Sequence, residues 1–461
     1  MWNLRKSPGP AAAEPANEAV PAPAPIQPAA AEPVTDDHMI ALKVKIHQLL
    51  LDRINLSLLD KMTREQIGAE VSEIVAEMLL AEGQVLNRTE RTALSHDVLD
   101  ELLGLGPLEP LLKDESITDI LVNGCDSVFV ERFGILERAP TRFQDERHLL
   151  RIIQKIVTAV GRRVDESSPF VDARLADGSR VNAIVAPLAI DGSLLSIRKF
   201  SKKPISMARM IELGSVPPAM ATVLEAVVAA RLNIIISGGT GSGKTTMLNA
   251  LSSYIDERER IVTIEDSAEL QLQQDHVARL ETRPPNIEGR GEVTQRDLVK
   301  NALRMRPDRI ILGECRAGEA FDMLQAMNTG HDGSMTTVHA NTPRDAMSRI
   351  EQMVGMSGID ISARSARAQI ASAINVVLQV GRLSDGRRKV LSLTELTGME
   401  GEVITMQEIF RFTMTGREED GKVAGHFEAT GIRPKFMGAL ASHGIDVDPS
   451  MFRPSTTFGH A

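Results

Sequence analysis

The chain has 461 residues, of which 43% are hydrophobic and 3% aromatic, and its formal net charge is −10. These totals predict two or three globular domains with largely aliphatic cores, and the acidic balance argues against a protein that coats duplex DNA. The two cysteines lie outside any C-x-x-C pair, so a disulfide framework and a structural zinc site are both unsupported. No apolar run approaches the roughly 18 residues of a membrane span, and the first residues lack a signal-peptide pattern, so we expect a cytoplasmic protein.

Residues 1–36 are rich in proline and alanine. Prolines recur from Pro8 to Pro33 and interrupt any helix, so this segment is predicted to be a disordered tether. Residues 2–6, Trp-Asn-Leu-Arg-Lys, either form a docking peptide for a partner or belong to a spacer that binds nothing. The pattern leaves both alternatives open.

Residues 37–110 are predicted to form a helical bundle. Leu42, Ile46 and Leu49 repeat at helical spacing, the same period returns over 67–79, and a third helix is expected over 88–103. Packing of the three helices against one another accounts for the apolar stripes. Docking of a partner is the less favoured alternative.

The sequence pattern changes near Ile117. Short β-type runs at 119–124, 128–131 and 135–138 precede a helix at 146–160, and three more runs follow at 170–174, 179–184 and 194–198. Asp-Gly turns at 177–178 and 191–192 separate the last three runs. Residues 111–203 are therefore expected to form an α+β domain with an antiparallel sheet, which ends in a hinge at 201–204.

Residues 204–445 alternate between strands and helices. Strands are predicted at 234–237, 261–264, 309–312, 335–338 and 376–380, and helices between them include 294–304, 317–327 and 343–353. This alternation predicts an α/β domain with a mainly parallel sheet and helices on both faces. A terminal β-hairpin layer is expected at 390–396 and 406–412, and 446–461 are expected to be a flexible tail.

The most specific motif of the chain lies in this last domain. The run Ile-Ile-Ile-Ser at 234–237 leads into G-x-x-x-x-G-K-T, and a helix is predicted directly after it. A strand, a glycine-rich turn and a helix in this order form a P-loop, whose backbone N–H groups cradle phosphates. Lys244 is expected to reach the β- and γ-phosphates of ATP or GTP, and the Thr245 hydroxyl to ligate Mg²⁺. The predicted nucleotide-binding residues are Gly239, Thr240, Gly241, Ser242, Gly243, Lys244, Thr245 and Thr246.

Polar groups follow three other predicted strands. Glu265-Asp266-Ser267-Ala268-Glu269 follows the strand at 261–264, Glu314 follows 309–312, and His339 follows 335–338. Ligands of open parallel sheets collect at the carboxyl ends of strands, so these groups are expected beside the P-loop. At this edge Glu314 is expected to bind the Mg²⁺ ion, and the acids of 265–269 to activate the attacking water. His339 is expected to contact the γ-phosphate.

These motifs resemble the Walker A, Asp box, Walker B and His box of the secretion-superfamily ATPases, which are hexameric motors of type II and type IV secretion and of type IV pili. The segments at 160–169, 172–182 and 195–200 resemble the tight-adherence (Tad) pilus branch, the CpaF type. The resemblance covers about residues 103–396. It implies a RecA-like ATPase domain preceded by a PAS-like α+β domain. Absence of the four-cysteine module of many type II secretion ATPases favours the Tad or type IV secretion branches.

The resemblance also implies roles for individual residues. Glu269 matches the Asp-box catalytic glutamate, Glu314 the Walker B acid near Mg²⁺, and His339 the His-box residue. The family places phosphate-contacting arginines in the α+β domain, and the candidates here are Arg174, Arg180 and Arg198; for each of them surface ion pairing is the alternative. Ser267 and Cys315 depart from the usual residues beside the key acids, with little consequence for the assignment.

The sequence thus predicts a homohexameric Mg²⁺-ATP motor that acts on an inner-membrane platform protein, with which it associates peripherally, and drives pilin assembly or retraction. One alternative is a type IV secretion ATPase that moves protein or DNA, although the acidic charge argues against direct contact with nucleic acid. A nucleotide-gated scaffold that scarcely hydrolyses ATP is the other alternative.

Overall fold

The computed structural model describes residue 46 and residues 62–81, 83–84, 86–200, 204–285, 289–419, 421–454 and 457–460. These residues belong to two compact units, Met1–Leu102 and Leu103–Ala461, and each is described by itself. The predicted tether, all of the first predicted helix except Ile46, and most of the predicted hinge lie outside the described residues. None of the helices in the described ranges is both long and apolar enough to cross a bilayer.

The first unit contains α3 (Arg64–Ala81) and most of α4 (Arg88–Leu103), which confirms the helices predicted over 67–79 and 88–103. Asn87 begins α4 with a reciprocal cap. Its side chain accepts from the Glu90 N–H at 2.8 Å, and the Glu90 carboxylate accepts from the Asn87 N–H at the same distance. Arg64 and Asp100 connect the two helices by an ion pair of 2.6 Å.

The second unit begins with η1 (Gly106–Leu108) and α5 (Glu109–Lys113), followed by an antiparallel six-stranded sheet in the order β3-β2-β1-β6-β5-β4. Helix α6 (Glu146–Ala159) starts at Asp145, whose side chain accepts from the His148 N–H, and it buries one apolar face in the core of this domain. The predicted α+β domain is confirmed. Its strands are β1 (Ile117–Asn123), β2 (Val128–Arg132), β3 (Ile135–Arg138), β4 (Phe170–Arg174), β5 (Arg180–Ile184) and β6 (Leu194–Arg198).

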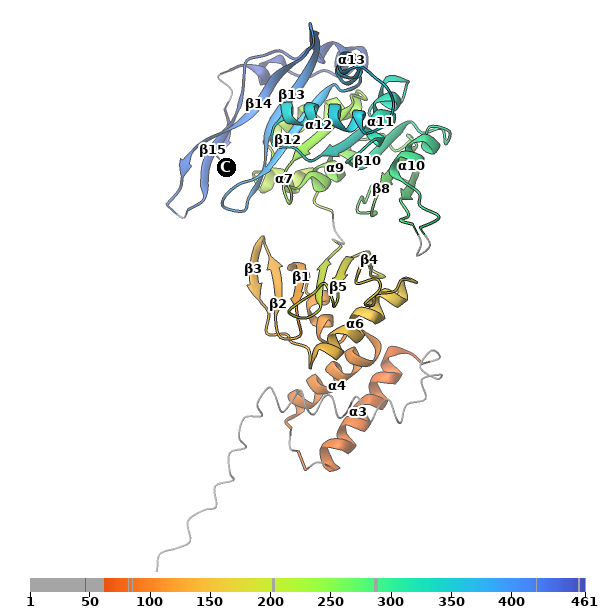
Figure 1. The fold of residues 1–461 in the computed structure, drawn as a ribbon. Helices are drawn as coiled ribbons and strands as arrows, with labels where there is room; N and C mark the ends of the chain where they lie inside the picture. Colours follow the sequence, from red (N-terminus) through yellow and green to blue (C-terminus); the bar gives the residue numbers. More distant parts are fainter. Residues whose placement is uncertain are drawn as a thin grey trace, which may run out of the picture. The chain divides into compact units, whose positions relative to one another are not determined.

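The rest of the second unit is built on a ten-stranded sheet, shown in Figure 1, in the order β16-β15-β14-β13-β12-β7-β11-β10-β8-β9. From β12 to β9 the neighbours are parallel, and from β12 to β16 they are antiparallel. This confirms the mainly parallel α/β sheet with a terminal antiparallel layer. The strands are β7 (Ile234–Gly238), β8 (Ile261–Glu265), β9 (Val277–Glu281), β10 (Arg309–Cys315), β11 (Met335–Val338), β12 (Val376–Arg382), β13 (Arg388–Glu400), β14 (Val403–Arg417), β15 (Val423–Ala429) and β16 (Thr457–His460).

Helices pack on both faces of this sheet because its central strands are apolar on both sides. Ile234 and Ile236 of β7 belong to one core and Ile235 to the other, as the alternation of a strand requires. The first core includes residues of α7 (Met207–Glu212), α8 (Pro218–Ala229), α9 (Lys244–Ser252) and α14 (Met437–Ser442). The second includes residues of α10 (Gln295–Ala302), α11 (Glu319–Asn328), α12 (Pro343–Gly355) and α13 (Ala363–Ala373).

Two parts of the fold differ from the expectation. Strand β9 was not predicted, because it is a five-residue edge strand in which no residue is buried. The segment after Asp446 was expected to be flexible, but it contains η2 (Pro449–Phe452) and β16, which pairs with β15. Burial of Phe452, whose ring centroid lies 5.6 Å from that of Phe410, attaches this segment to the first core.

Candidate functional site

The P-loop has a backbone that only glycines allow at several points. Gly241 and Gly243 have φ of 68° and 93°, in the left-handed region. Gly238 is restricted for another reason, because a Cβ there would lie 2.5 Å from the Val380 carbonyl oxygen on β12. The buried Ser242 closes the turn by donating from Oγ to the Gly239 carbonyl at 2.8 Å. The turn between β7 and α9 therefore has the tight shape that phosphate binding requires.

Lys244, the first residue of α9, folds back over this turn. Its Nζ donates to the Gly239 carbonyl at 3.0 Å. Burial lowers the pKa of Lys244; Glu314 opposes this shift, while Arg198 and Arg316 add to it. A partly desolvated ammonium inside a glycine-rich turn is a strong partner for an anionic phosphate.

The register of the parallel strands brings the predicted polar groups to one edge of the sheet. Ser237 of β7 is paired with Val338 of β11, which is paired with Cys315 of β10. His339 and Glu314 therefore lie at the same edge as the P-loop, and the segment after β8 lies at that edge too. His339 is partly exposed, and within the described part of the chain its side chain makes no hydrogen bond. It is thus available to a ligand.

Arg316 joins two of these acids. Its Nε and Nη2 donate to Oε2 of Glu314 at 2.9 and 2.6 Å, and its Nη1 donates to Asp266 at 3.0 Å. Burial alone would lower the pKa of Arg316, but these carboxylates outweigh it and raise that pKa. The sequence places Arg316 two residues after Glu314 but contains no sign of the Asp266 contact, because Asp266 follows a different strand.

Glu265 organises the Asp-box segment, residues 265–269. It is buried, and its Oε2 accepts from the backbone N–H groups of Glu269 at 2.7 Å and Leu270 at 2.9 Å. Burial raises the pKa of Glu265 to about 7, against the effect of these two hydrogen bonds. Glu265 thus holds in place the loop that carries Glu269, a positioning role that was not foreseen from the sequence.

The three candidate arginines of the α+β domain all have acidic partners. Arg180 donates to Glu269 at 2.9 Å. Arg174 contacts Ser267 and forms a 3.1 Å ion pair with Glu281 of β9. Arg198 is more exposed, lies 4.0 Å from Asp119, and is close enough to Lys244 to lower its pKa. Arg174 and Arg180 therefore contact the Asp-box region of the ATPase domain, and Arg198 faces the P-loop side.

Two side chains fit a Mg²⁺ ion beside a bound nucleotide. Among the described residues, the Thr245 hydroxyl has no hydrogen-bond partner, and the hydrogen bonds that Glu314 accepts from Arg316 use only its Oε2. Hydroxyl and carboxylate oxygens are the donors that Mg²⁺ prefers. Thr245 and Glu314 would hold the ion, which would neutralise phosphate charge when bound.

The chain is similar to proteins of a known family. The family described as type II/IV secretion system protein matches residues 101–415. A putative conjugal transfer protein of Mycobacterium tuberculosis is 41% identical over 325 residues, which cover 69% of this chain and 92% of that protein. The type IV secretion system protein VirB11 of Bartonella quintana is 31% identical over 332 residues, covering 63% of this chain and 92% of its own length.

Solved structures with a similar chain include the VirB11 ATPase from the Brucella suis type IV secretion system in complex with sulphate. It is 28% identical, covers 63% of this chain and 95% of its own, and has a TM-score of 0.34. The ATPase DotB of Legionella pneumophila is 23% identical, covers 64% of this chain and 80% of its own, and has a TM-score of 0.45.

Proposed function

This chain is a member of the type II/IV secretion system protein family, and from that membership we propose that it is an ATP-hydrolysing motor of a secretion or pilus machine. One observation supports the activity above all. Lys244 in the P-loop, Glu314 near the end of β10, and His339 after β11 lie at one edge of the parallel part of the sheet. This is the set that Mg²⁺-dependent phosphoryl transfer needs: a phosphate cradle, a metal-binding acid and a γ-phosphate contact.

In the proposed mechanism, ATP lies between the α+β domain and the ATPase domain. The phosphates bind the P-loop N–H groups and Lys244, and Glu269 removes a proton from the attacking water. His339 and arginines of the α+β domain contact the γ-phosphate when the domains close. Loss of the γ-phosphate removes these contacts and the domains reopen, because a ligand shifts a conformational equilibrium only through its different affinity for the two states.

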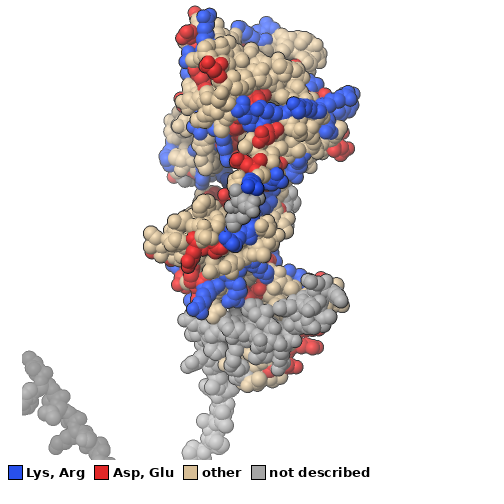
Figure 2. Space-filling view, turned by 45° about the vertical axis from the view of Figure 1, so that its right-hand side comes forward, with Lys and Arg blue, Asp and Glu red and all other residues tan. Residues whose placement is uncertain are grey.

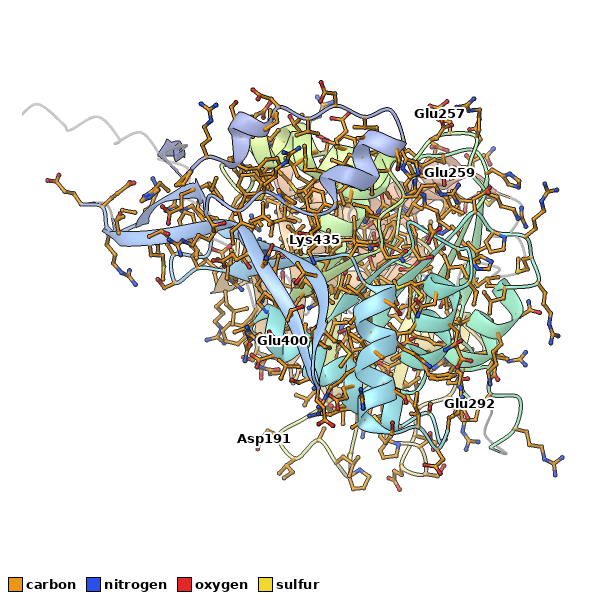
Figure 3. The ribbon with its side chains drawn as sticks, turned by 90° about the horizontal axis from the view of Figure 1, so that it is seen from above. Asp191, Glu257, Glu259, Glu292, Glu400 and Lys435 are labelled. Atoms are coloured by element: carbon orange, nitrogen blue, oxygen red, sulfur yellow. The ribbon has the colours of Figure 1, made fainter. Side chains whose placement is uncertain are left out.

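Phosphate release by purified protein tests the activity. Lys244→Ala is expected to lose both ATP binding and turnover, and Glu314→Ala to lose turnover while still binding nucleotide. Lys300→Ala and Glu292→Ala are matched controls, since both residues are exposed and Glu292 lies at the rim of the domain (Figure 3). Full turnover in either Lys244→Ala or Glu314→Ala would refute the site.

We also propose that six copies form a ring in which neighbouring subunits close in sequence. The contacts of Arg174 and Arg180 with the Asp-box region support closure of the α+β domain on the ATPase domain. Mass photometry with and without a slowly hydrolysed ATP analogue tests the ring. A particle that stays monomeric at micromolar concentration with nucleotide bound would contradict it.

We propose two alternatives for the machine that the motor serves. The segments at 160–169 and 172–182 support Tad pilus assembly through a membrane platform protein. The similarity to a putative conjugal transfer protein and to VirB11 supports the alternative, a type IV secretion ATPase. On the face shown in Figure 2, acidic and basic side chains are intermingled, which gives no support to a nucleic-acid track.

Two measurements separate these candidates. Deletion of the gene followed by electron microscopy of the cell surface is expected to show loss of thin pili if the protein is a Tad motor. Turnover that rises with added DNA would instead favour a DNA translocase. If the protein binds ATP but shows no steady-state phosphate release, it is a nucleotide-gated scaffold instead.

A further inference from the structure

Two arginines of the β12–β13 hairpin lie against the P-loop. Arg388 on β13 donates from Nε to the Gly241 carbonyl at 2.9 Å. Arg382, the last residue of β12, is close to the same glycine, since its Nη1 lies 3.8 Å from the position of a Cβ on Gly241. Both guanidinium groups therefore contact or approach the backbone of the P-loop.

Arg382 also reaches the α+β domain. Its Nη2 donates at 2.7 Å to the carbonyl of Gly134, which lies in the turn between β2 and β3. Gly134 has a φ of 84°, and a Cβ on it would lie 2.8 Å from that Nη2, so the close approach depends on glycine. The Arg382 side chain thus connects the edge of the P-loop with a hairpin that lies 248 residues before Arg382 in the chain.

The charges at this point depend on the α+β domain. Partial burial, and next to it the charge of Arg382, lower the pKa of Arg388, and Arg198 of β6 acts in the same direction. Glu131 of β2 and Asp119 of β1 oppose this effect. The two like-charged guanidiniums of the hairpin remain together because carbonyl groups and these carboxylates compensate their repulsion. Movement of the α+β domain would remove two acids, one carbonyl and one arginine from their surroundings.

We propose that Arg382 and Arg388 are positioning residues that couple the shape of the P-loop to the position of the α+β domain. When the β2–β3 turn contacts Arg382, Arg388 holds the Gly241 carbonyl, and the N–H groups of the P-loop point to the phosphates. When the β2–β3 turn withdraws, the two guanidinium groups lose their compensating partners and move apart, and the P-loop loosens. By linkage, nucleotide binding then favours the docked position of the α+β domain by the same factor. This inference rests on the proposed function.

The first test measures the dissociation constant of a fluorescent ATP analogue on the full chain, separately from kcat. Arg388→Gln is expected to weaken binding about ten-fold, within the usual range of coupling between sites. Arg382→Gln, which touches the P-loop only at its edge, should weaken binding several-fold, and the double variant should be no weaker than Arg388→Gln alone. Arg411→Gln is the control, because Arg411 is exposed on β14 and pairs with Glu428.

A second pair of variants tests the route through the α+β domain. Glu131→Gln removes a counter-charge of Arg388 and should change nucleotide affinity, whereas Glu137→Gln on the exposed strand β3 should not. If Arg388→Gln does not fold, Arg388→Lys takes its place. This variant keeps the charge and one donor group and is expected to retain part of the parent protein's affinity for the nucleotide.

The outcomes separate this inference from the function on which it rests. Affinities within two-fold of the parent for both single arginine variants, or effects that multiply in the double variant, would overturn the coupling while ATP turnover continues. A parent protein that does not bind or hydrolyse ATP would refute the proposed function itself.

Discussion

Nη1 of Arg180 lies 2.9 Å from Oε1 of Glu269, so an arginine of the α+β domain is paired with the acid proposed to activate water. Both side chains remain partly exposed, at 42% and 29%. The pair is therefore accessible to a nucleotide that would compete for the arginine. The same contact reports how the α+β domain docks on the ATPase domain.

Glu269→Gln is expected to lower turnover by about 10²–10⁴, the usual contribution of a general base, and to leave ATP affinity within a few-fold. Steady-state phosphate release and nucleotide titration measure the two effects. Glu281→Gln is the matched control, because Glu281 also pairs with an arginine of the α+β domain but lies on β9. Equal losses in the two variants would show that the ion pairs, and not the base, matter.

Two adjacent glycines should respond differently to alanine. Gly238→Ala places a Cβ 2.5 Å from the Val380 carbonyl oxygen, whereas Gly239→Ala places one in open space. In thermal melts without nucleotide, Gly238→Ala is expected to lower the melting temperature clearly and Gly239→Ala to leave it nearly unchanged. Equal melting temperatures would contradict the close approach of β12 to the P-loop.

Arg309 is fully buried and has a bidentate partner. It donates to both carboxylate oxygens of Glu259, labelled in Figure 3, at 2.7 and 2.8 Å. Glu259→Ala leaves an unpaired buried guanidinium and is expected to lower the unfolding free energy by about 3–5 kcal/mol. Urea denaturation measures the loss. Asp256→Ala, which breaks the neighbouring exposed pair with Arg258, should change the midpoint little; a similar loss there would contradict the argument.

Lys389 should make the free energy of unfolding depend on pH in the alkaline range. It is buried, donates to the Gly214 carbonyl at 2.8 Å, and lies over the rings of Phe412 and Phe427. Burial lowers its pKa to about 8. Between pH 8 and the unfolded value of about 10.4, the unfolded chain binds more protons than the folded chain, so stability rises with pH.

The expected rise is at most about 1.4 kcal/mol per pH unit. Urea midpoints of the parent and of Lys389→Met, measured between pH 7 and 10, give the difference, which should favour the parent increasingly as the pH rises. Parallel curves would show that Lys389 is not desolvated in the folded protein.

Patterns among neighbouring residues were sufficient to predict many of the helices and strands of this fold. The β-branched run before Gly238 and the glycines after it predict a strand and a P-loop, because alternation and left-handed turns are properties of neighbouring residues. Strand β11 was predicted to the residue for the same reason. The edge strand β9 and the segment after Asp446 were not, since tertiary packing stabilises them more than their own pattern does.

The sequence by itself determined the glycine-rich turn after β7 and the three polar strand ends, because each is a short contiguous motif. Only the tertiary structure decided which charges meet: Arg180 with Glu269, Arg316 with Asp266, and Arg388 with Gly241. These partners are separated by 89, 50 and 147 positions. Their pairing depends on the order and register of strands, which arise from packing across the whole sheet.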